Sequence, residues 1–386
     1  MTRRVCVVGV GLSDGPVTPD MNGLMLEAQA FQRAVADAGL AKADVDGLAS
    51  AGYGGMHEVM LAEYLGIAPQ WLESTSCGGS SFELHAMHAW RAIEAGDAET
   101  IAIVYGNNQL SASGRTLGTG GGGGRGVLPH PMGYELPTGL TLVGAYALAA
   151  QRHMHEYGTT PEQLASIAVQ VREHAARNPN AMYRDPITVD DVLASKLVAD
   201  PLHKLDCCVI SDGGCCIVLT TEERARDLPH RPVYVRGAAA AMTHHSVHSM
   251  PDLTRSAGAV CGPKAFAQAG ITPADVDTFQ MYDSFTYTVL VCLEDLGFAP
   301  KGEGGAFAAD GNLRLGGALP TNTDGGGLSA THPGMRGLFL LCEATRQLRG
   351  AAGDAQVPGA EIAVAHGSGG WLSTMGTVVL GTEPTR

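Results

Sequence analysis

The alternation of apolar and polar residues predicts short strands and longer helices, and one order of these segments occurs twice along the chain. The apolar stretch RVCVVGV near the N-terminus predicts a strand, a helical pattern ends at Gly39, and VDGLASAGY predicts a second strand. The same order returns as RPVYVRGAAA, a helix ending at Gly270, and VDTFQMYDSF. The joining segments also match, because ADAGLAKADVD begins at Ala36 and AQAGITPADVD begins at Ala267. This repeat predicts two strand–helix–strand halves, related by a pseudo-twofold axis, within an α/β fold.

Each half then supplies a glycine-containing turn that leads into a helix. In the first half, CGG starting at Cys77 precedes a helical pattern that ends at Gly96. In the second half, a glycine run starting at Gly325 precedes a pattern that ends at Gly350. Because the halves are related by a pseudo-twofold axis, the two helix starts are expected to face each other. Catalytic groups are best placed there, since the positive end of a helix dipole stabilises negative charge.

The predicted halves span residues 1–230 and 231–386, and the first carries a loop insertion at about 107–200. Within the insertion, TTPEQLASIAVQVREHAARNP predicts an amphipathic helix with a proline in its first turn. The insertion also contains the pentaglycine of LGTGGGGGRG, which Arg125 follows. A phosphate-binding loop would need a lysine and a Ser or Thr after its glycines. A flexible loop over a pocket or at a subunit contact is therefore favoured.

Composition narrows the class of protein. The chain has 386 residues, of which 45% are hydrophobic and 17% charged, so it can bury a large core. Its 25 Lys and Arg against 39 Asp and Glu give a net charge of -14, which argues against nucleic acid as a partner. No apolar stretch approaches the roughly 20 residues of a membrane span. We expect a soluble globular protein.

The nine cysteines include two adjacent pairs, in LDCC and GGCC, and no set with the spacing of zinc ligands. No metal site is predicted. Adjacent cysteines on a strand point to opposite sides and suit a reducing cytoplasm better than a disulfide framework. Cys77 differs from the others, because a helix start favours the thiolate. From this stretch alone it is a candidate nucleophile or an inert buried cysteine.

Four further motifs complete the pattern: SDGGCC at 211–216, YDSF at 282–285, HPGMRG at 332–337 and the C-terminal AHGSGGWLSTMGTVVLG. Together with the repeat, they resemble the thiolase superfamily, and within it the sterol carrier protein x type thiolases and thiolase-like acyl-CoA aldolases. The resemblance covers essentially the whole chain. It implies a duplicated thiolase fold with a layered α/β/α/β/α core. It also implies an enzyme of lipid metabolism, steroid degradation included, with coenzyme A as part of the substrate and no bound cofactor.

The thiolase pattern assigns roles to several positions. In thiolases a cysteine at the start of the first-half helix takes the acyl group, the histidine of an HPxG motif activates it, and a second cysteine in a CxG motif moves the proton. His332 matches the HPxG histidine. When the helix is aligned from its C-terminal end without gaps, the nucleophile position falls on Gly79, two residues after Cys77. The second cysteine is replaced by His366, whose ring is a candidate acid or base.

Tyr282 is a further departure, because thiolases commonly place Asn or His at the first position of this motif, as part of an oxyanion hole. A tyrosine hydroxyl can donate a hydrogen bond to an enolate oxygen or transfer a proton. The alternative is a packed aromatic at a strand end. The candidate oxyanion-hole and substrate-binding residues are Gly79, Asp283, Gly367 and Gly369.

The loss of both cysteines removes covalent acyl transfer and leaves enolate chemistry. We therefore favour retro-aldol cleavage of a β-hydroxyacyl-CoA, with His332, His366 or Tyr282 as the base. Thiolase-like steroid side-chain aldolases provide the family precedent, and they act with a small OB-fold or zinc-ribbon partner. They have a tyrosine near the HPxG motif, where this chain has Thr331-His332.

Two alternatives stay open. The first is a thiolase or C-acyltransferase, similar to acetyl-CoA acetyltransferase, in which Cys77 is acylated. The second is a non-catalytic scaffold subunit. The family resemblance also implies a homodimer. Arg125, Arg152 and Lys204 are basic residues that could meet the phosphates of CoA. The acyl group of the substrate has no readable signature.

Overall fold

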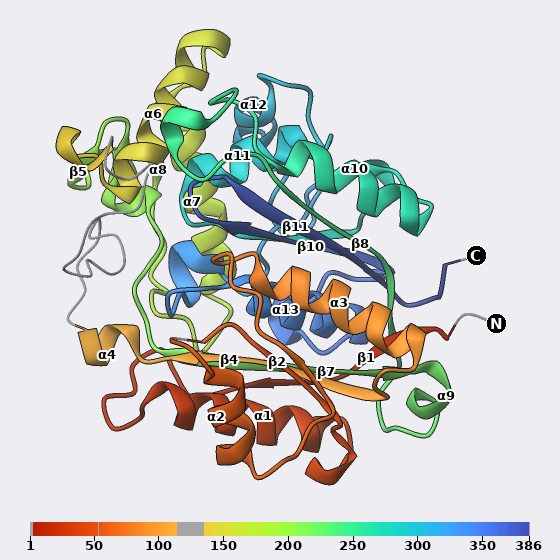
Figure 1. The fold of residues 1–386 in the computed structure, drawn as a ribbon. Coiled ribbons are helices and arrows are strands. Elements are labelled where there is room, and N and C mark those ends of the chain that lie inside the picture. Colours follow the sequence, from red (N-terminus) through yellow and green to blue (C-terminus); the bar gives the residue numbers. More distant parts are fainter. Residues whose placement is uncertain (1–2, 53, 114–134, 386) are drawn as a thin grey trace.

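Nine strands form one hydrogen-bonded sheet in the computed structural model, which describes residues 3–52, 54–113 and 135–385. Their order across the sheet is β3-β2-β4-β7-β1-β8-β11-β10-β9 (Figure 1). The strands are β1 (Val5–Leu12), β2 (Gly47–Ser50), β3 (Trp71–Glu73), β4 (Thr100–Asn107), β7 (Gly213–Thr221), β8 (Val233–Met242), β9 (Thr278–Met281), β10 (Ile362–Gly369) and β11 (Thr374–Gly381). A separate two-stranded sheet pairs β5 (Leu197–Ala199) with β6 (Leu202–His203).

The repeat seen in the sequence is a repeat of structure. In the first half β1 leads to α1 (Gly23–Asp37) and β2, and in the second half β8 leads to α10 (Gly258–Ala269) and β9. Both helices are followed by a glycine with positive φ, 68° at Gly39 and 65° at Gly270. A single 3-10 turn then precedes each second strand, η1 (Lys42–Asp44) in one half and η5 (Pro273–Asp275) in the other. The prediction of a duplicated α/β fold is confirmed.

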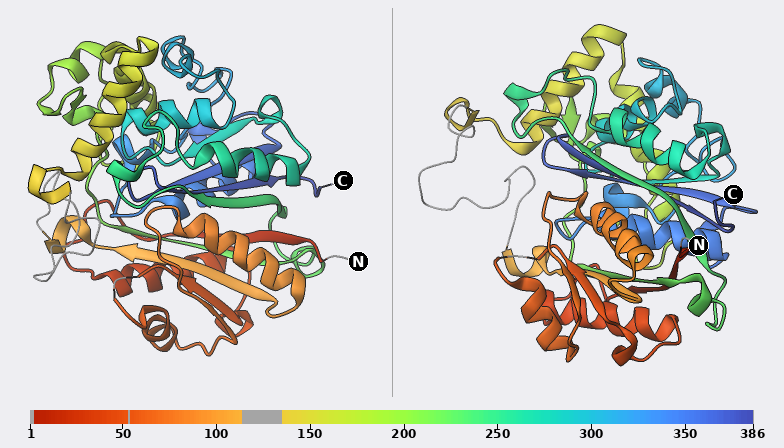
Figure 2. Two further views of the ribbon diagram at one scale, coloured as in Figure 1. Left: turned by 45° about the horizontal axis from the view of Figure 1, so that its top comes forward. Right: turned by 45° about the vertical axis from the view of Figure 1, so that its right-hand side comes forward.

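The two halves of the sheet meet at a narrow junction. Strand β1 lies antiparallel to β8, and their register joins two Cα pairs, Cys6 with Tyr234 and Val7 with Val233. Figures 1 and 2 show that the β4–β7–β1 part and the β8–β11–β10 part lie as two layers, with α3 (Ser81–Ala95) and α13 (Gly337–Arg349) between them. The sheet therefore folds over the two central helices.

Helices also cover both outer faces, which completes the expected α/β/α/β/α layering. Helices α1 and α2 (His57–Leu65) pack on the outer face of the first-half strands, around Phe31 and Leu61. Helices α10 and α11 (Thr286–Asp295) pack on the outer face of the second-half strands. The apolar side chains of α3 and α13 share one core with strands from both halves. Each central helix is thus buried on two sides.

The remaining helices belong mainly to the insertion and to the edges of the layers. They are α4 (Gln109–Ser113), α6 (Leu142–Tyr157), α7 (Pro161–Ala175), α8 (Val189–Ala194), α9 (Glu222–Ala225) and α12 (Gly304–Ala309), with short turns η2 (Leu136–Thr138), η3 (Lys204–Asp206), η4 (Val247–Ser249), η6 (Gly326–Ala330) and η7 (Gly353–Ala355). None of the described helices is long and apolar enough to cross a membrane.

The insertion confirms one prediction and leaves another untested. The segment predicted to be an amphipathic helix is α7, which begins after Thr160 with a capping box formed by Thr160 and Gln163. Leu164, Ile167 and Val171 face the core. The pentaglycine and Arg125 lie outside the residues that the structure describes.

The adjacent cysteines of β7 point to opposite faces of the sheet, as predicted. Cys215 packs in the layer of α3 and α13, whereas Cys216 packs in the layer of α1. All nine cysteines are free thiols. No group of His, Cys, Asp or Glu in the described parts of the chain could hold a metal ion.

Candidate functional site

The starts of α3 and α13 are in direct contact at the centre of the molecule. Gly337, the first residue of α13, lies with its Cα against the carbonyl oxygen of Gly79, and a Cβ at residue 337 would overlap that oxygen. Only glycine allows this approach. The free N–H groups and positive dipole ends of two long helices therefore meet here, as the repeat predicted.

Tyr282 and His332 form a hydrogen-bonded pair beside these helix starts. The Tyr282 hydroxyl lies 2.9 Å from Nε2 of His332, and the two rings are nearly perpendicular, at 88°. The ring of Tyr282 is buried, and burial raises the pKa of its hydroxyl well above the usual value. The hydroxyl therefore keeps its proton at neutral pH. The pair can relay a proton between a phenol and an imidazole.

The ring of Tyr282 also packs directly on Gly79. A Cβ at residue 79 would overlap Cε2 and Cζ of Tyr282 and would lie 2.5 Å from the carbonyl oxygen of Ser368. Gly79 is the position onto which the ungapped helix alignment places the thiolase nucleophile. The space that a nucleophilic side chain would occupy there is filled by the Tyr282 ring.

Cys77 lies in the turn just before α3 and is half-buried. Its backbone N–H donates to Oγ of Ser81 at 2.9 Å, and its Sγ lies 3.5 Å from Oγ of Ser80. The turn continues through Gly78, whose φ of 82° favours glycine. The Cα of Gly369 packs against the Cys77 carbonyl so closely that a Cβ at residue 369 would overlap it. Gly369 therefore shapes this turn.

The loop that carries His332 is fixed by residues of the first half. The His332 backbone N–H donates to Oγ of Ser211 at 2.9 Å. The carbonyl of Pro333 accepts hydrogen bonds from the Tyr105 hydroxyl at 2.6 Å and from Nδ2 of Asn107 at 3.0 Å. These contacts come from the end of β4 and from Ser211, two residues before β7, so both halves build the candidate site.

Asp283 also binds the segment that leads to His332. Its carboxylate accepts the backbone N–H groups of Gly327 at 2.7 Å and Leu328 at 3.0 Å, and it lies 3.6 Å from Nε of Arg336. The fully buried Arg336 donates to both carboxylate oxygens of Asp324 at 2.6 Å and to the carbonyl of Thr331 at 2.8 Å. Burial raises the pKa of Asp283 to about 6, against the opposing charge of Arg336. The carboxylate of Asp283 thus positions the loop that precedes His332 by binding the backbone N–H groups of that loop.

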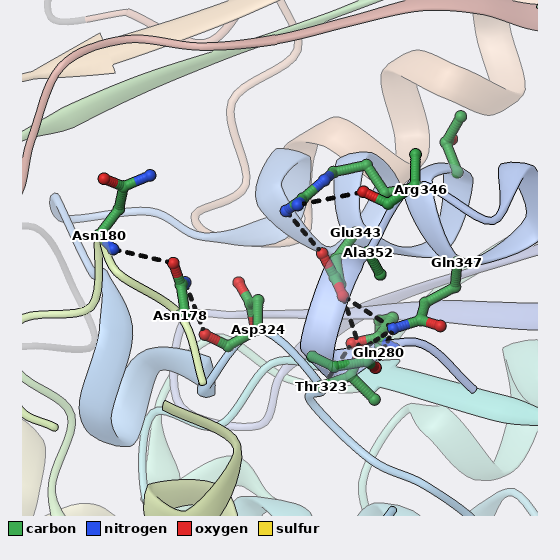
Figure 3. A network of polar contacts seen from close by, with 12 residues as sticks. Asn178, Asn180, Gln280, Thr323, Asp324, Glu343, Arg346, Gln347 and Ala352 are labelled. Atoms are coloured by element: carbon green, nitrogen blue, oxygen red, sulfur yellow. Dashed lines mark hydrogen bonds and ion pairs between the residues drawn. The ribbon is translucent and has the colours of Figure 1, made fainter. Parts of the chain in front are cut away.

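A polar network behind Asp324 extends this support (Figure 3). Nδ2 of Asn178 donates to the carbonyl of Asp324 at 2.8 Å, and the hydroxyl of the neighbouring Thr323 donates to the buried carboxylate of Glu343 at 2.7 Å. Burial raises the pKa of Glu343. Arg346 completes the network with a contact of 3.1 Å to the same carboxylate. The network joins the insertion to α13.

His366 has a different orientation from the other candidate residues. It lies on β10, where alternate residues face opposite sides of the sheet. Gly367 faces α3, so the ring of His366 faces α10, and its Nδ1 lies 2.8 Å from Oγ1 of Thr377 on the neighbouring strand β11. Burial lowers the pKa of His366 to about 3. The contact of His366 with the Tyr282–His332 pair is made by its backbone carbonyl, which accepts the Tyr282 N–H at 2.9 Å.

Residues 239–382 match the family model described as Thiolase C-terminal domain-like. Over 356 residues, the chain is 36% identical to the steroid side-chain-cleaving aldolase of Thermomonospora curvata, and the match covers 90% of each chain. The chain belongs to the thiolase superfamily. It is of the sterol carrier protein x type, like the thiolase-like acyl-CoA aldolases.

Other members of the thiolase superfamily match over different extents. A solved structure titled Ltp2-ChsH2(DUF35) aldolase superposes with a TM-score of 0.88 and 33% identity, covering 98% of this chain and 97% of the other. The acetyl-CoA acetyltransferase of Methanothermobacter thermautotrophicus is 42% identical over 239 residues, covering 61% of this chain and 62% of that protein. Aldolases thus match over nearly the full length, and the acetyltransferase matches over part of it.

Two buried ionisable residues of this candidate site were missed in the sequence. Arg336 stands inside the HPGMRG motif, and its charge next to an apolar helix was a usable signal. Glu83 lies in the first turn of α3 and is 1% exposed. Its only signal was a lone carboxyl in the stretch SSFELHAMHAW.

Proposed function

We propose that this chain is a thiolase-like lyase that cleaves a β-hydroxyacyl-CoA by a retro-aldol reaction. The observation that carries the proposal is the Tyr282–His332 hydrogen bond, together with the Tyr282 ring on Gly79. In this proposal the Tyr282 ring takes the place of the thiolase nucleophile beside Gly79, and its hydroxyl and His332 transfer the proton. The near full-length similarity to an aldolase supports the same reaction.

The proposed reaction needs one base, one acid and an enolate site. His332 accepts the β-hydroxyl proton of the substrate, either directly or through the Tyr282 hydroxyl. The electron pair of that O–H bond forms the new C=O, and the Cα–Cβ bond breaks to release a ketone or aldehyde. The electrons of the broken bond become the enolate of the acyl-CoA. The proton then returns from the pair to Cα, so the products carry every atom of the substrate.

The enolate oxygen would lie at the start of α3. The first N–H groups of α3 have no partner within the helix, although that of Ser81 donates to the Gly78 carbonyl at 3.1 Å, and the helix dipole stabilises an anion there. The Tyr282 hydroxyl keeps its proton, so it is available as a second donor. We assign Gly367 and Gly369 a shaping role, because each leaves room for a close neighbour, Glu83 or the Cys77 carbonyl. His366 contributes its backbone.

In this proposal Cys77 is a neighbour of the site and not its nucleophile. The test is mass spectrometry of the protein after incubation with a panel of acyl-CoA thioesters. We expect no acyl adduct on any cysteine. A stable adduct on Cys77 that disappears in Cys77→Ser would support acyl transfer, the second candidate, which the 42% identity to an acetyl-CoA acetyltransferase favours.

The substrate class and partners follow from the relatives. We propose a CoA thioester with a steroid-derived acyl group, because one relative is named for steroid side-chain cleavage. A DUF35-type accessory chain is proposed from the solved aldolase complex.

A homodimer is proposed through β3, an edge strand on which Leu72 is 46% exposed. Nine free thiols fit a cytoplasmic protein. The halves are taken as 1–230 and 231–386.

The decisive experiment is an assay of the purified protein, with and without a coexpressed DUF35-type partner, on β-hydroxyacyl-CoA substrates. We expect release of a ketone or aldehyde, and loss of that release in His332→Ala. Turnover that is unchanged in His332→Ala would contradict the mechanism. Binding of acyl-CoA with no turnover in the complex would favour the scaffold alternative.

A further inference from the structure

Glu83 is a buried carboxyl that the proposed reaction does not use. It is the third residue of α3, one helical turn after Gly79, and it is 1% exposed. Neither of its carboxyl oxygens has a hydrogen-bond partner among the described residues. A buried polar group without a partner costs free energy, so its presence beside the site calls for a reason.

The fold leaves space for Glu83 by means of three glycines from three other elements. A Cβ on Gly367 of β10 would overlap the carboxyl group, and a Cβ on Gly337 of α13 would lie 2.6 Å from Oε2. A Cβ on Gly376 of β11 would lie 2.6 Å from the Glu83 Cβ. Any larger residue at these positions would displace the side chain. The carboxyl is thus confined between the starts of the two central helices and the second-half sheet.

The surroundings of Glu83 favour its neutral form. It takes part in no ion pair within the described parts of the chain, and the guanidinium of the nearby Arg336 is bound to Asp324. Titratable side chains approach Glu83 from β4 (Tyr105), β7 (Cys215), α10 (Cys261), α13 (Cys342) and the end of β9 (Tyr282), and none of them is a cation. On α3 itself, His85 and His88 are held by the Thr75 carbonyl and by Glu73. Burial raises the pKa of Glu83 to about 8.

A protonated carboxyl has one O–H to donate, and one acceptor lies close by. The carbonyl oxygen of Gly79 and Oε2 of Glu83 both lie within 3 Å of the position that a Cβ on Gly337 would occupy, so the two oxygens are neighbours. We propose that Glu83 is a positioning residue, which as a neutral acid donates a hydrogen bond to the Gly79 carbonyl and so fixes the turn on which Tyr282 rests. Its effect on turnover rests on the proposed function, whereas its protonation and the geometry of the turn do not.

Three variants of the full-length protein test the proposal. Glu83→Gln keeps the shape and supplies an N–H donor, Glu83→Leu has similar bulk and no donor, and Glu94→Gln is the matched control at the other end of α3. Infrared spectra of the unliganded protein at pH 7 should show the C=O stretch of a protonated carboxyl. The band should be absent in Glu83→Gln, present in Glu94→Gln, and lost from the parent protein as the pH passes about 8.

Kinetics and crystal structures test the positioning role. Loss of one neutral hydrogen bond should lower kcat about tenfold in Glu83→Leu with little change in KM, and Glu83→Gln should restore kcat to within about twofold. Absence of the infrared band at pH 7 would overturn the proposal whatever the substrate. A Glu83→Leu protein with full kcat would overturn it as well. If the parent protein cleaves no β-hydroxyacyl-CoA, the proposed function fails, and an unmoved Gly79 turn in the Glu83→Leu crystal structure would then refute the positioning role.

Discussion

The ring of Tyr282 rests on the Cα of Gly79, in the volume that any side chain at residue 79 would need. The hydroxyl of the same ring reaches His332 at 2.9 Å. A nucleophilic side chain at residue 79 and Tyr282 in this position exclude each other. Under the proposed function, this one contact between two residues separates proton-transfer chemistry from covalent acyl transfer.

Gly79→Ala tests that contact. We expect a loss of about 1–3 kcal/mol in the free energy of unfolding, because the added methyl overlaps the Tyr282 ring and the Ser368 carbonyl. Chemical denaturation measures it. Gly55→Ala is the control, since a Cβ there meets no atom within 4 Å. A Gly79→Ala protein as stable as the control would mean that the ring does not occupy this space.

Tyr282→Phe separates chemistry from packing. The ring and its contact with Gly79 remain, while the hydroxyl that bonds to His332 is lost. We expect kcat for β-hydroxyacyl-CoA cleavage to fall about 10²–10⁴-fold, as for the loss of an acid–base group. Tyr146→Phe removes another buried hydroxyl, which bonds to the Gly370 carbonyl, and should leave kcat within a few fold. Equal effects of the two substitutions would refute a chemical role for Tyr282.

Arg336→Met tests the support of the His332 loop. The substitution leaves the buried carboxylate of Asp283 and the partly buried carboxylate of Asp324 without their cation, so we expect a loss of about 3–5 kcal/mol in unfolding free energy. Arg314→Met breaks an exposed pair with Glu173 and should cost at most about 1 kcal/mol. Thermal and denaturant unfolding distinguish these outcomes. Similar losses of unfolding free energy in the two variants would show that the ion pairs of Arg336 with Asp283 and Asp324 stabilise the fold no more than an exposed pair does.

Glu83→Gln should change how stability depends on pH. The carboxyl loses its proton at about 8 in the folded chain and near its ordinary 4.5 in the unfolded chain. Between these values the folded state binds one more proton, so the contribution of Glu83 to stability is complete below about 4.5 and falls as pH rises towards 8. Relative to the parent, Glu83→Gln should therefore gain stability over this range, by up to roughly 5 kcal/mol.

Denaturant unfolding of both proteins at several pH values measures this difference, and Glu94→Gln is the control. A difference that stays constant from pH 5 to pH 8 would mean that Glu83 ionises alike in both states. That result would contradict the proposal that Glu83 is a neutral acid in the folded protein.

The fold was predictable because its signals are local. The two ADVD segments mark the same 3-10 turn after Gly39 and Gly270, and the apolar stretches before them are β1 and β8. What could not be predicted is the narrow junction between β1 and β8, since a pairing of two residues leaves no pattern in either strand.

The site was predictable only in part. The HPGM sequence singled out His332, and YDSF singled out Tyr282, but their mutual hydrogen bond depends on long-range packing. The direction of the His366 ring depends on which residues of β10 face α3, and a shift of one position would reverse it. Glu83 was hidden for a different reason, because its surroundings are glycines from three distant elements, which carry no periodic signal.

The Pro333 carbonyl is held by Tyr105 and Asn107, so the loop of the second copy depends on a strand of the first. Gly79 comes from one copy, and Tyr282 and His332, which we propose to act beside it, come from the other. The two halves share their fold and contribute different residues to the candidate site. Neither half can be replaced by a second copy of the other half, because a chain made of two identical halves would lack part of the candidate site.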